Sequence, residues 1–399
     1  MKSTKIIKKA IAVLMAVLLM STPVLAAELV PVRATFEGQG WSVDWDAAHR
    51  RVIVTSPGGA TYFIAIDQPG SIIENGRVYS PVDVVELLMF AGEQAQRVQD
   101  RMVEDVIIHG KLTRVTYGDN VAYLFGTMHA AQPHWFPLHP MAEEAMRRAD
   151  VFAFEHDLAE TAALLADPAV VAQIGAIQLL PDGLTLVDIL PDDVYENFVL
   201  NLGTYSFLGI TYENVRYLTP IALVMAIEQL AFTLLGVDFS ISVDEYILSV
   251  ALENNRPTFG LNTMLHEFEI LFDVPTEIQA YALVDFPTFK DYLEAVADMG
   301  LIEMYAAQDI EGMREMVTAI YGNASDNPYM ELFHYNLLRV RCHIFVDAIA
   351  RFLTETEDPS TLFVAVGMLH IIGGCCGGIV LYLLEDMGFE VEPLWKAAQ

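Results

Sequence analysis

Two apolar segments with the same pattern lie far apart in the chain, Ala122–His129 and Leu362–His370. In each, a run of aliphatic and aromatic residues ends at a glycine, and a histidine stands three positions after that glycine. Such runs are typical of buried strands, and a glycine lets the backbone turn where the strand ends. Functional sites in open α/β sheets form at the carboxyl ends of strands. If both strands belong to one sheet, the pattern brings His129 and His370 to a shared site.

The region around the first histidine predicts further β-structure. Leu112–Tyr117 and Val121–Phe125 predict a hairpin that turns at residues 118–120. A helix is expected from Pro140 to Ala149, and a second buried strand at Asp150–Phe154. Glu155 follows that strand directly, and a carboxylate in such a place is costly unless it has a partner or a function.

The long middle of the chain is predicted to be helical, because its apolar residues recur at spacings of three and four. The expected helices are Leu184–Leu200, Val215–Leu235, Val243–Asn254, Val274–Ala306 and Met330–Leu353. A short strand is predicted within residues 256–262, and a final strand at Phe389–Val391 is expected at a sheet edge. The pattern therefore predicts an α/β (α+β) fold, with a central mixed sheet and a large helical middle.

The N-terminal part follows a different pattern. Residues 1–27 combine four lysines with an apolar core and small residues near Ala26, which predicts a secretory signal peptide. Residues 28–88 alternate short strands and turns and predict a small β-rich domain. Residues 89–110 are expected to form a helical linker, and residues 111–399 the main domain.

The segment Leu362–Leu384 allows a competing interpretation, because its 23 residues contain no charge and are long enough to cross a bilayer. It also contains His370 and five glycines. It divides better into a strand, a glycine-rich turn and a helix from Ile379 to Met387. We therefore expect no membrane span apart from the signal segment.

The net charge of the chain limits the kinds of molecule that it is expected to bind. The chain has 22 basic and 53 acidic residues, and without the four lysines of the signal segment the net charge is 18 minus 53, or −35. Such a charge disfavours nucleic acid and anionic membrane surfaces as partners, and it suits a secreted or cell-surface protein. Three cysteines, Cys342, Cys375 and Cys376, are too few for a disulfide framework, so the 54% of hydrophobic residues must build the core.

Several motifs occur together in the main domain. They are Tyr-Leu-Phe-Gly-Thr-Met-His at residues 123–129, Phe-Pro-Leu at 136–138, the strand with Asp150, Glu155 and Asp157, and Val-Ala-Val-Gly-x-x-His at 364–370. In this combination the sequence resembles the TraB/GumN family, which includes the Tiki metalloproteases, from about Leu112 to Leu394. Asp244 also falls where family members have a similar residue. The resemblance implies an extracellular α/β fold of two related halves and, as in Tiki proteins, metal-dependent cleavage of peptide bonds.

By position, the resemblance assigns His129, His370 and Glu155 as metal ligands, and Glu155 and Arg341 as catalytic residues. The chemistry is consistent with this, since two imidazoles and a carboxylate can hold a divalent ion such as Mn, Co or Zn. Glu155 would also accept a proton from water, and Arg341 would stabilise the developing oxyanion.

Other interpretations stay open. Glu155 and Arg341 could form a buried salt bridge without a catalytic role. His156 should face the other side of its strand and is expected to be structural, and Thr127 is expected to satisfy backbone groups. His134, His139 and His334 are expected at the surface.

The sequence departs from the family pattern in three places. Asn262 stands where many relatives have a glutamate, and an amide cannot act as a base. Cys342 replaces an asparagine that follows the helix arginine in relatives, and Cys375 and Cys376 lie in a loop that is glycine-rich in the family. These changes bear on catalysis more than on the fold.

Residues 28–88 resemble the N-terminal domain of copper amine oxidases, in Val43–Asp46, Val52–Val54 and Ile73–Pro81. The resemblance implies a cell-wall-binding or spacer role without copper chemistry. Taken together, the sequence predicts a secreted metal-dependent hydrolase acting on a peptide or protein substrate. Two alternatives stay open: a non-catalytic extracellular protein that binds a peptide or another ligand, and an esterase-like hydrolase.

Overall fold

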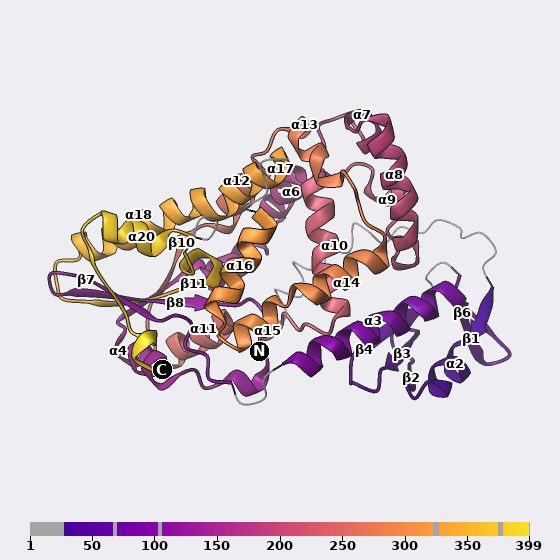
Figure 1. Ribbon diagram of the computed structural model, residues 1–399, viewed down its shortest axis with the longest axis horizontal. Helices are drawn as coiled ribbons and strands as arrows, with labels where there is room; N and C mark the ends of the chain where they lie inside the picture. Colours follow the sequence, from indigo (N-terminus) through magenta and orange to yellow (C-terminus); the bar gives the residue numbers. More distant parts are fainter. Residues whose placement is uncertain (1–27, 67–69, 103–105, 322–326, 374–377, 399) are drawn as a thin grey trace.

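The computed structural model describes residues 28–66, 70–102, 106–321, 327–373 and 378–398. The predicted signal peptide, Cys375 and Cys376 lie outside these residues. The chain forms a small β-rich N-terminal part and a larger part built on a six-stranded sheet (Figure 1). The predicted fold class, a mixed α/β fold with a central mixed sheet after a β-rich segment, is confirmed.

The central sheet has the strand order β10, β9, β11, β8, β7, β12. These strands are β10 (Thr258–Asn262), β9 (Val151–His156), β11 (Thr361–Gly367), β8 (Asn120–Thr127), β7 (Thr113–Tyr117) and β12 (Glu390–Pro393). The first four are parallel, whereas β7 is antiparallel to both β8 and β12. The predicted hairpin is β7–β8 and the predicted edge strand is β12, so both predictions are confirmed.

Both faces of this sheet are covered by helices. On one face Phe125, Phe152 and Phe363 belong to a core shared with α4 (Pro140–Arg148), α11 (Val243–Glu253), α15 (Leu301–Ala306) and α16 (Ile310–Tyr321). On the other face Leu124 and Val364 pack with α18 (Arg341–Glu355) and α20 (Val380–Asp386). Parallel strands buried on both faces need apolar residues at every position. This need explains the uninterrupted apolar runs of β8 and β11.

The helical middle is built from shorter helices than predicted. The range Leu184–Leu200 is divided at Pro191 into α7 (Leu186–Ile189) and α8 (Asp192–Leu202), because proline has no N–H to continue a helix. Pro287 and Gly300, which has φ +68°, interrupt the range Val274–Ala306. That range forms α13 (Thr276–Gln279), η3 (Ala280–Leu283), α14 (Phe289–Met299) and α15.

The predicted helix at Val215–Leu235 starts later, as α10 (Pro220–Leu234), whereas the one at Val243–Asn254 is confirmed as α11. His134 is exposed as predicted and His139 is half-buried. The prediction of His334 at the surface is wrong, because it lies in α17 (Pro328–His334), which is covered by η3, α13 and α16. Further helices of the larger part include η1 (Pro133–Trp135), α5 (Leu158–Leu164), α6 (Pro168–Ile177), η2 (Gly203–Leu208), α9 (Tyr212–Val215), α12 (Met264–Phe272) and η6 (Trp395–Ala398).

The segment Leu362–Leu384 folds as predicted into a strand, a turn region and a helix. These are β11, the short helix α19 (Met368–Ile371) and α20, with part of the connection outside the described residues. Among the residues that the structure describes, no helix is long and apolar enough to span a membrane.

The N-terminal part consists of two three-stranded sheets and two helices. Its elements are β1 (Leu29–Pro31), α2 (Val32–Gly38), β2 (Ser42–Asp46), β3 (Arg51–Thr55), β4 (Thr61–Ala65), β5 (Ile72–Glu74), β6 (Arg77–Pro81) and α3 (Val82–Arg101). Its buried residues form one hydrophobic core with α8, α10 and α14 of the helical middle. The Tyr62 hydroxyl donates to the Leu234 carbonyl at 2.8 Å within this contact.

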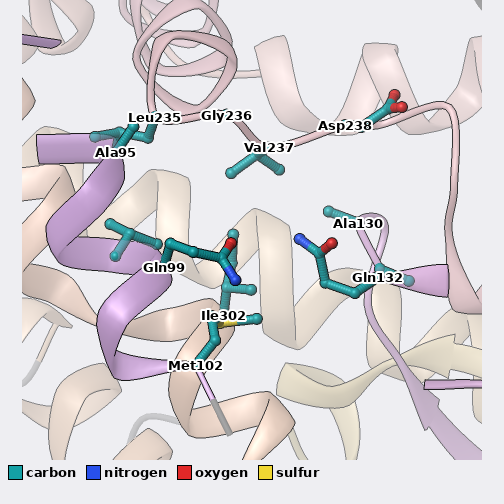
Figure 2. A pocket seen from close by; sticks show the side chains of 12 residues that line it. Ala95, Gln99, Met102, Ala130, Gln132, Leu235, Gly236, Val237, Asp238 and Ile302 are labelled. Carbon is teal, nitrogen blue, oxygen red and sulfur yellow. The ribbon is translucent and has the colours of Figure 1, made fainter. Parts of the chain in front are cut away.

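A crevice lies where α3 meets the rest of the molecule (Figure 2). Its walls are α3, the segment Ala130–Gln132, the segment Leu235–Asp238, and Ile302 of α15. We call it the α3 crevice.

Candidate functional site

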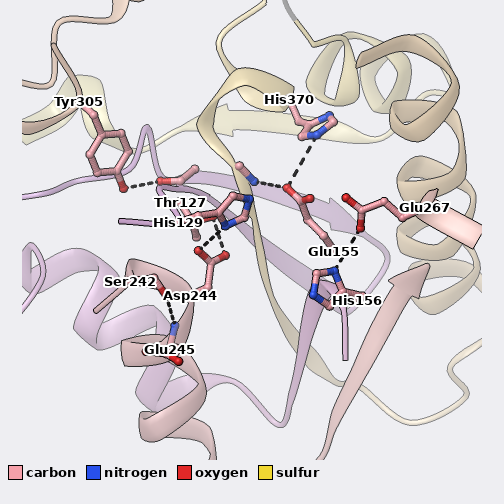
Figure 3. Close-up of polar contacts among 12 residues, drawn as sticks. Thr127, His129, Glu155, His156, Ser242, Asp244, Glu245, Glu267, Tyr305 and His370 are labelled. Atoms are coloured by element: carbon pink, nitrogen blue, oxygen red, sulfur yellow. Dashed lines mark hydrogen bonds and ion pairs between the residues drawn. The ribbon is translucent and has the colours of Figure 1, made fainter. Parts of the chain in front are cut away.

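The two Gly-x-x-His motifs leave the central sheet at one edge. Strands β8 and β11 are parallel neighbours, with Thr127 opposite Gly367. Strand β9 pairs with the other side of β11 and brings Glu155 to the same edge. Figure 3 shows the polar side chains that gather there. The structure therefore places His129, His370 and Glu155 at the edge where the sequence pattern expected them.

His129 is held by a carboxylate from another element. Its Nδ1 lies 3.1 Å from Asp244 Oδ2, and the Thr127 hydroxyl donates to Asp244 Oδ1 at 2.7 Å. Because a carboxylate only accepts, Nδ1 carries a proton, and in the neutral ring Nε2 keeps its lone pair. Asp244 raises the pKa of His129 to about 10, which favours a proton on Nε2 as well near pH 7, so a metal ion would have to displace that proton. The side chain is 63% exposed, and water weakens this attraction.

Glu155 is buried and fully engaged by its neighbours. Its Oε2 is paired with the Arg341 guanidinium, and its Oε1 accepts the Gly367 N–H at 2.6 Å. A Cβ at Gly367 would lie 3.0 Å from that same oxygen, so a side chain there would crowd the carboxylate. Burial raises the pKa of Glu155, but Arg341, then His370 and His129, outweigh it and hold that pKa below its usual range. Glu155 is therefore ionised at neutral pH.

Arg341 lies between two carboxylates. Besides Glu155 it contacts Glu267 Oε1 at 3.0 Å, and its side chain is only 4% exposed. It is the first residue of α18, directly after the π-helical turn η5 (Tyr335–Val340), and such turns occur frequently at functional sites. The buried ion pair that the sequence left as an alternative is confirmed as a contact.

His370 lies in α19 and is buried. Its Nδ1 is 3.3 Å from Cys342 Sγ, and its ring meets the Phe345 ring edge-on at 5.0 Å. Its Nε2 faces Glu155 Oε1 at 3.8 Å, which is longer than a hydrogen bond. Burial lowers the pKa of His370 to about 4, so its ring is neutral near pH 7. The cysteine that departs from the family pattern thus orients this imidazole.

A glycine packs directly against the backbone of His370. A Cβ at Gly378 would lie 2.2 Å from His370 Cα, a distance that real side chains do not reach. We expect Gly378→Ala to displace α19 and to lower the free energy of unfolding by about 1–3 kcal/mol, measured by urea denaturation. The matched control is Gly175→Ala in α6, where a Cβ meets nothing within 4 Å. That change should raise stability by about 0.5–1 kcal/mol. Equal effects of both changes would contradict this packing.

Two residues of the network, Asp244 and Glu267, were not assigned to the site from the sequence. Asp244 was noted only for its position, yet it binds both Thr127 and His129, so the expectation that Thr127 serves backbone groups is wrong. Glu267 of α12 links Arg341 to His156, whose Nδ1 lies 3.2 Å from Glu267 Oε2. One feature of the sequence could have pointed to them: Asp244 and Glu267 are each an acidic residue in the first turn of a helix, α11 and α12.

Asn262, at the end of β10, has an amide whose orientation is fixed. Its Oδ1 accepts the Thr263 N–H at 2.8 Å and lies 2.7 Å from His266 Nδ1. Its Nδ2 is buried and, among the described residues, has no hydrogen-bond partner. Asn262 therefore offers a donor at this edge of the sheet, where a glutamate would offer an acceptor.

The donors at this sheet edge fit a divalent ion in their chemistry but not as a ready-made cluster. In the described part of the chain, no three His, Cys, Asp or Glu side chains surround one point as metal ligands do. The chemistry of the individual donors nevertheless fits, because each imidazole uses Nδ1 for a fixed partner and leaves Nε2 without a hydrogen bond. Histidines that bind metals have this arrangement of an outer partner on one ring nitrogen. The ionised Glu155 adds a negative donor beside His370.

Comparison with known proteins gave one family. A sequence model of the TraB/PrgY/gumN family matches residues 111–393. Neither the curated proteins nor the solved structures gave a match. The match contains both Gly-x-x-His motifs, Glu155 and Arg341, and it starts after the β-rich N-terminal part.

Proposed function

The chain belongs to the TraB/PrgY/gumN family, and from this premise we propose that it is a metal-dependent hydrolase that cleaves peptide bonds outside the cytoplasm. The observation that carries the proposal is the pair of oriented imidazoles at one sheet edge. His129 is held by Asp244 and His370 by Cys342, and both Nε2 atoms are left for a ligand. The Tiki-like activity and the export signal at residues 1–27 are part of the same proposal and rest on the sequence.

In this proposal His129, His370 and Glu155 hold the ion. A bound divalent ion acts as a Lewis acid toward a peptide carbonyl and allows hydrolysis near neutral pH. His370 is suited to bind it because burial keeps the ring neutral, and Arg341 is suited to keep Glu155 ionised. A lowered pKa makes Glu155 a better ligand than proton acceptor, since a general base works best with a pKa near the working pH.

The test is metal removal and return on the full chain. We expect the protein to bind one Mn, Co or Zn ion, to lose cleavage of a peptide library on dialysis against a chelator, and to regain it with the ion. Free ion at 100 times its Kd should raise the free energy of unfolding by about 2.7 kcal/mol. Absence of bound ion, or cleavage that is indifferent to the chelator, would overturn the proposal.

One observation favours a second function, a protein that binds a peptide without cutting it. Both oxygens of Glu155 already have partners, Arg341 and the Gly367 N–H, which leaves the site without an evident proton acceptor. In that case Glu155→Gln would leave peptide affinity unchanged, and the metal-loaded protein would show no turnover. Cleavage that is lost in Glu155→Gln favours the hydrolase instead.

A further inference from the structure

His370 lies on a helix that is too short to be stable by itself. Helix α19 has four residues, and a single turn fixes several backbone angles for very few hydrogen bonds. The direction of the His370 ring therefore depends on what the ends of α19 contact. Ile371, its last residue, and the following Ile372 are both buried, so their carbonyls need partners from the protein.

Two cations supply these partners. The Lys111 ammonium donates to the Ile371 carbonyl at 2.8 Å and to the Ile372 carbonyl at 2.9 Å. The Arg314 Nε donates to the Ile372 carbonyl at 2.6 Å. Basic side chains that bond the last carbonyls of a helix stabilise its C-terminal end. We call Lys111 and Arg314 the α19 clamp.

Lys111 is the buried member of the clamp. It is 7% exposed, whereas the other two lysines of the described residues, Lys290 and Lys396, are exposed. Burial lowers the pKa of Lys111 to about 8, and the charges of Arg314 and Lys396 lower it as well, so the ammonium is still mostly charged near pH 7. A buried ammonium is costly unless it is hydrogen-bonded. The two bonds to the end of α19 therefore offset the cost of burying Lys111.

The turn that carries Lys111 is also bonded to β8. The Gly126 N–H donates to the Gly110 carbonyl at 2.7 Å. The turn packs so closely that a Cβ at Gly110 would lie 2.3 Å from the Phe125 ring. Gly126 is the glycine of the first Gly-x-x-His motif, and β8 leads to His129. The clamp thus links the strand of the first motif to the helix of the second.

Loss of the clamp would change the position of His370. The two carbonyls would be buried without partners, which is unfavourable enough for the end of α19 to move toward water. Such a movement would turn the His370 ring away from Glu155, whose Oε1 now lies 3.8 Å from Nε2 (Figure 3). Binding sites need their side chains within about 0.5 Å of the productive geometry. Even a small movement of α19 would therefore weaken an ion held by His370.

We propose that Lys111 and Arg314 are positioning residues of the candidate metal site. By holding the end of α19, they keep His370 Nε2 turned toward Glu155. They act through the α19 backbone, so neither is a ligand or a catalytic residue. This inference rests on the proposed function for the identity of the ligand, a divalent ion.

The first measurement follows His370 itself in the metal-free full chain. The protein is labelled with ¹³C-histidine, and the His370 Hε1 signal, assigned by its absence in His370→Ala, reports on the Phe345 ring 5.0 Å away. We expect Lys111→Met to move this signal by more than its linewidth. Lys396→Met is the matched control, because it removes an exposed lysine whose charge also acts on Lys111, and it should leave the signal in place.

The second measurement is the affinity of the same proteins for Co²⁺, followed by the visible absorption of the bound ion. We expect Lys111→Met to raise the Kd about 10- to 100-fold, the usual effect of losing a group that orients a ligand. Arg314→Met should raise it less, because Ile372 keeps its bond to Lys111. Tyr62→Phe removes a buried hydrogen bond in the N-terminal part, so it controls for a general loss of stability and should leave the Kd unchanged.

An unmoved His370 signal in Lys111→Met would overturn the inference, as would an equal rise of the Kd in Lys111→Met and Tyr62→Phe. If Lys111→Met does not fold, Arg314→Met decides by the same two measurements, since the Arg314 side chain is 32% exposed and its removal disturbs the core less.

The result is separable from the proposed hydrolysis. A moved signal and weakened Co²⁺ binding, in a protein whose wild type cleaves no peptide, would uphold the inference and reject the hydrolase. Metal-dependent cleavage with an unmoved signal and an unchanged Kd in both clamp variants would do the reverse. A wild type that binds no Co²⁺ would overturn both proposals.

Discussion

The His129→Ala variant should lose stoichiometric metal and peptide cleavage while it keeps its fold. Of the two histidine substitutions, His129→Ala separates metal binding from stability better, because the His129 side chain is 63% exposed and its removal opens no buried space. We expect metal content to fall below one tenth of the wild-type value and cleavage to fall by at least about 100-fold, more than the loss of an outer partner of a ligand causes. Metal analysis and peptide assays measure these changes, and circular dichroism follows the fold.

His370→Ala should have the same effect on metal and cleavage, with an added loss of stability from the vacated space beside Phe345, about 2–4 kcal/mol. His134→Ala is the control, since this exposed histidine lies five positions after His129 and outside the network. Metal content that is unchanged in both ligand variants would contradict the assignment of the two motifs.

Arg341→Met should produce the largest loss of stability. The change removes the cation between Glu155, which is buried, and Glu267, which is half-buried, and leaves the two carboxylates close together without their shared guanidinium. Breaking a buried pair in this way costs about 3–5 kcal/mol, which urea denaturation at pH 7 would measure. Arg351→Met on the same helix is the control, because Arg351 is exposed and its Nε donates to the Asp347 carbonyl of that helix, and its effect should stay within about 0.5 kcal/mol.

The effect of Arg341→Met should also depend on pH. In the wild type the lowered pKa values of Glu155 and Glu267 contribute stability above the usual carboxyl pKa of 4.5, and this contribution is lost as pH falls through the lowered values. Without Arg341, burial raises both pKa values, so the carboxyls take up protons at higher pH. The difference between variant and wild type should therefore begin to shrink above pH 4.5, where the variant's carboxyls take up protons, and shrink further below pH 4.5, where the wild type loses its contribution. A difference that is independent of pH would mean that Arg341 acts through packing alone.

Much of the fold could be predicted because it depends on local patterns. The runs that became β8 and β11 are apolar at every position, since both faces of the sheet are covered. The helix at Val243–Asn254 has one apolar stripe and a serine cap, and it formed as predicted. Errors arose where proline or glycine interrupts an apolar stripe, at Pro191 and Gly300, because a stripe continues in the sequence after the helix has ended.

The site could be predicted only in part. His129, His370 and Glu155 were found because strand ends mark a sheet edge, and Arg341 was found through the resemblance to the family. Asp244 and Glu267 were not assigned to the site, although they contact His129 and Arg341. Their helices reach the edge by packing against segments about a hundred residues away in the chain, and no local pattern encodes such a contact.

By itself, the sequence determined that β8, β9 and β11 are buried strands, that glycines lie at the ends of β8 and β11, and which side chains follow them. These features are local, because strand formation and the turn at a glycine depend on neighbouring residues. Only the tertiary structure decided that β8 and β11 are neighbours, that Arg341 is paired with Glu155, and that α3 packs in one core with α10 and α14. Those facts depend on which surfaces are buried together, and burial is a property of the whole folded chain.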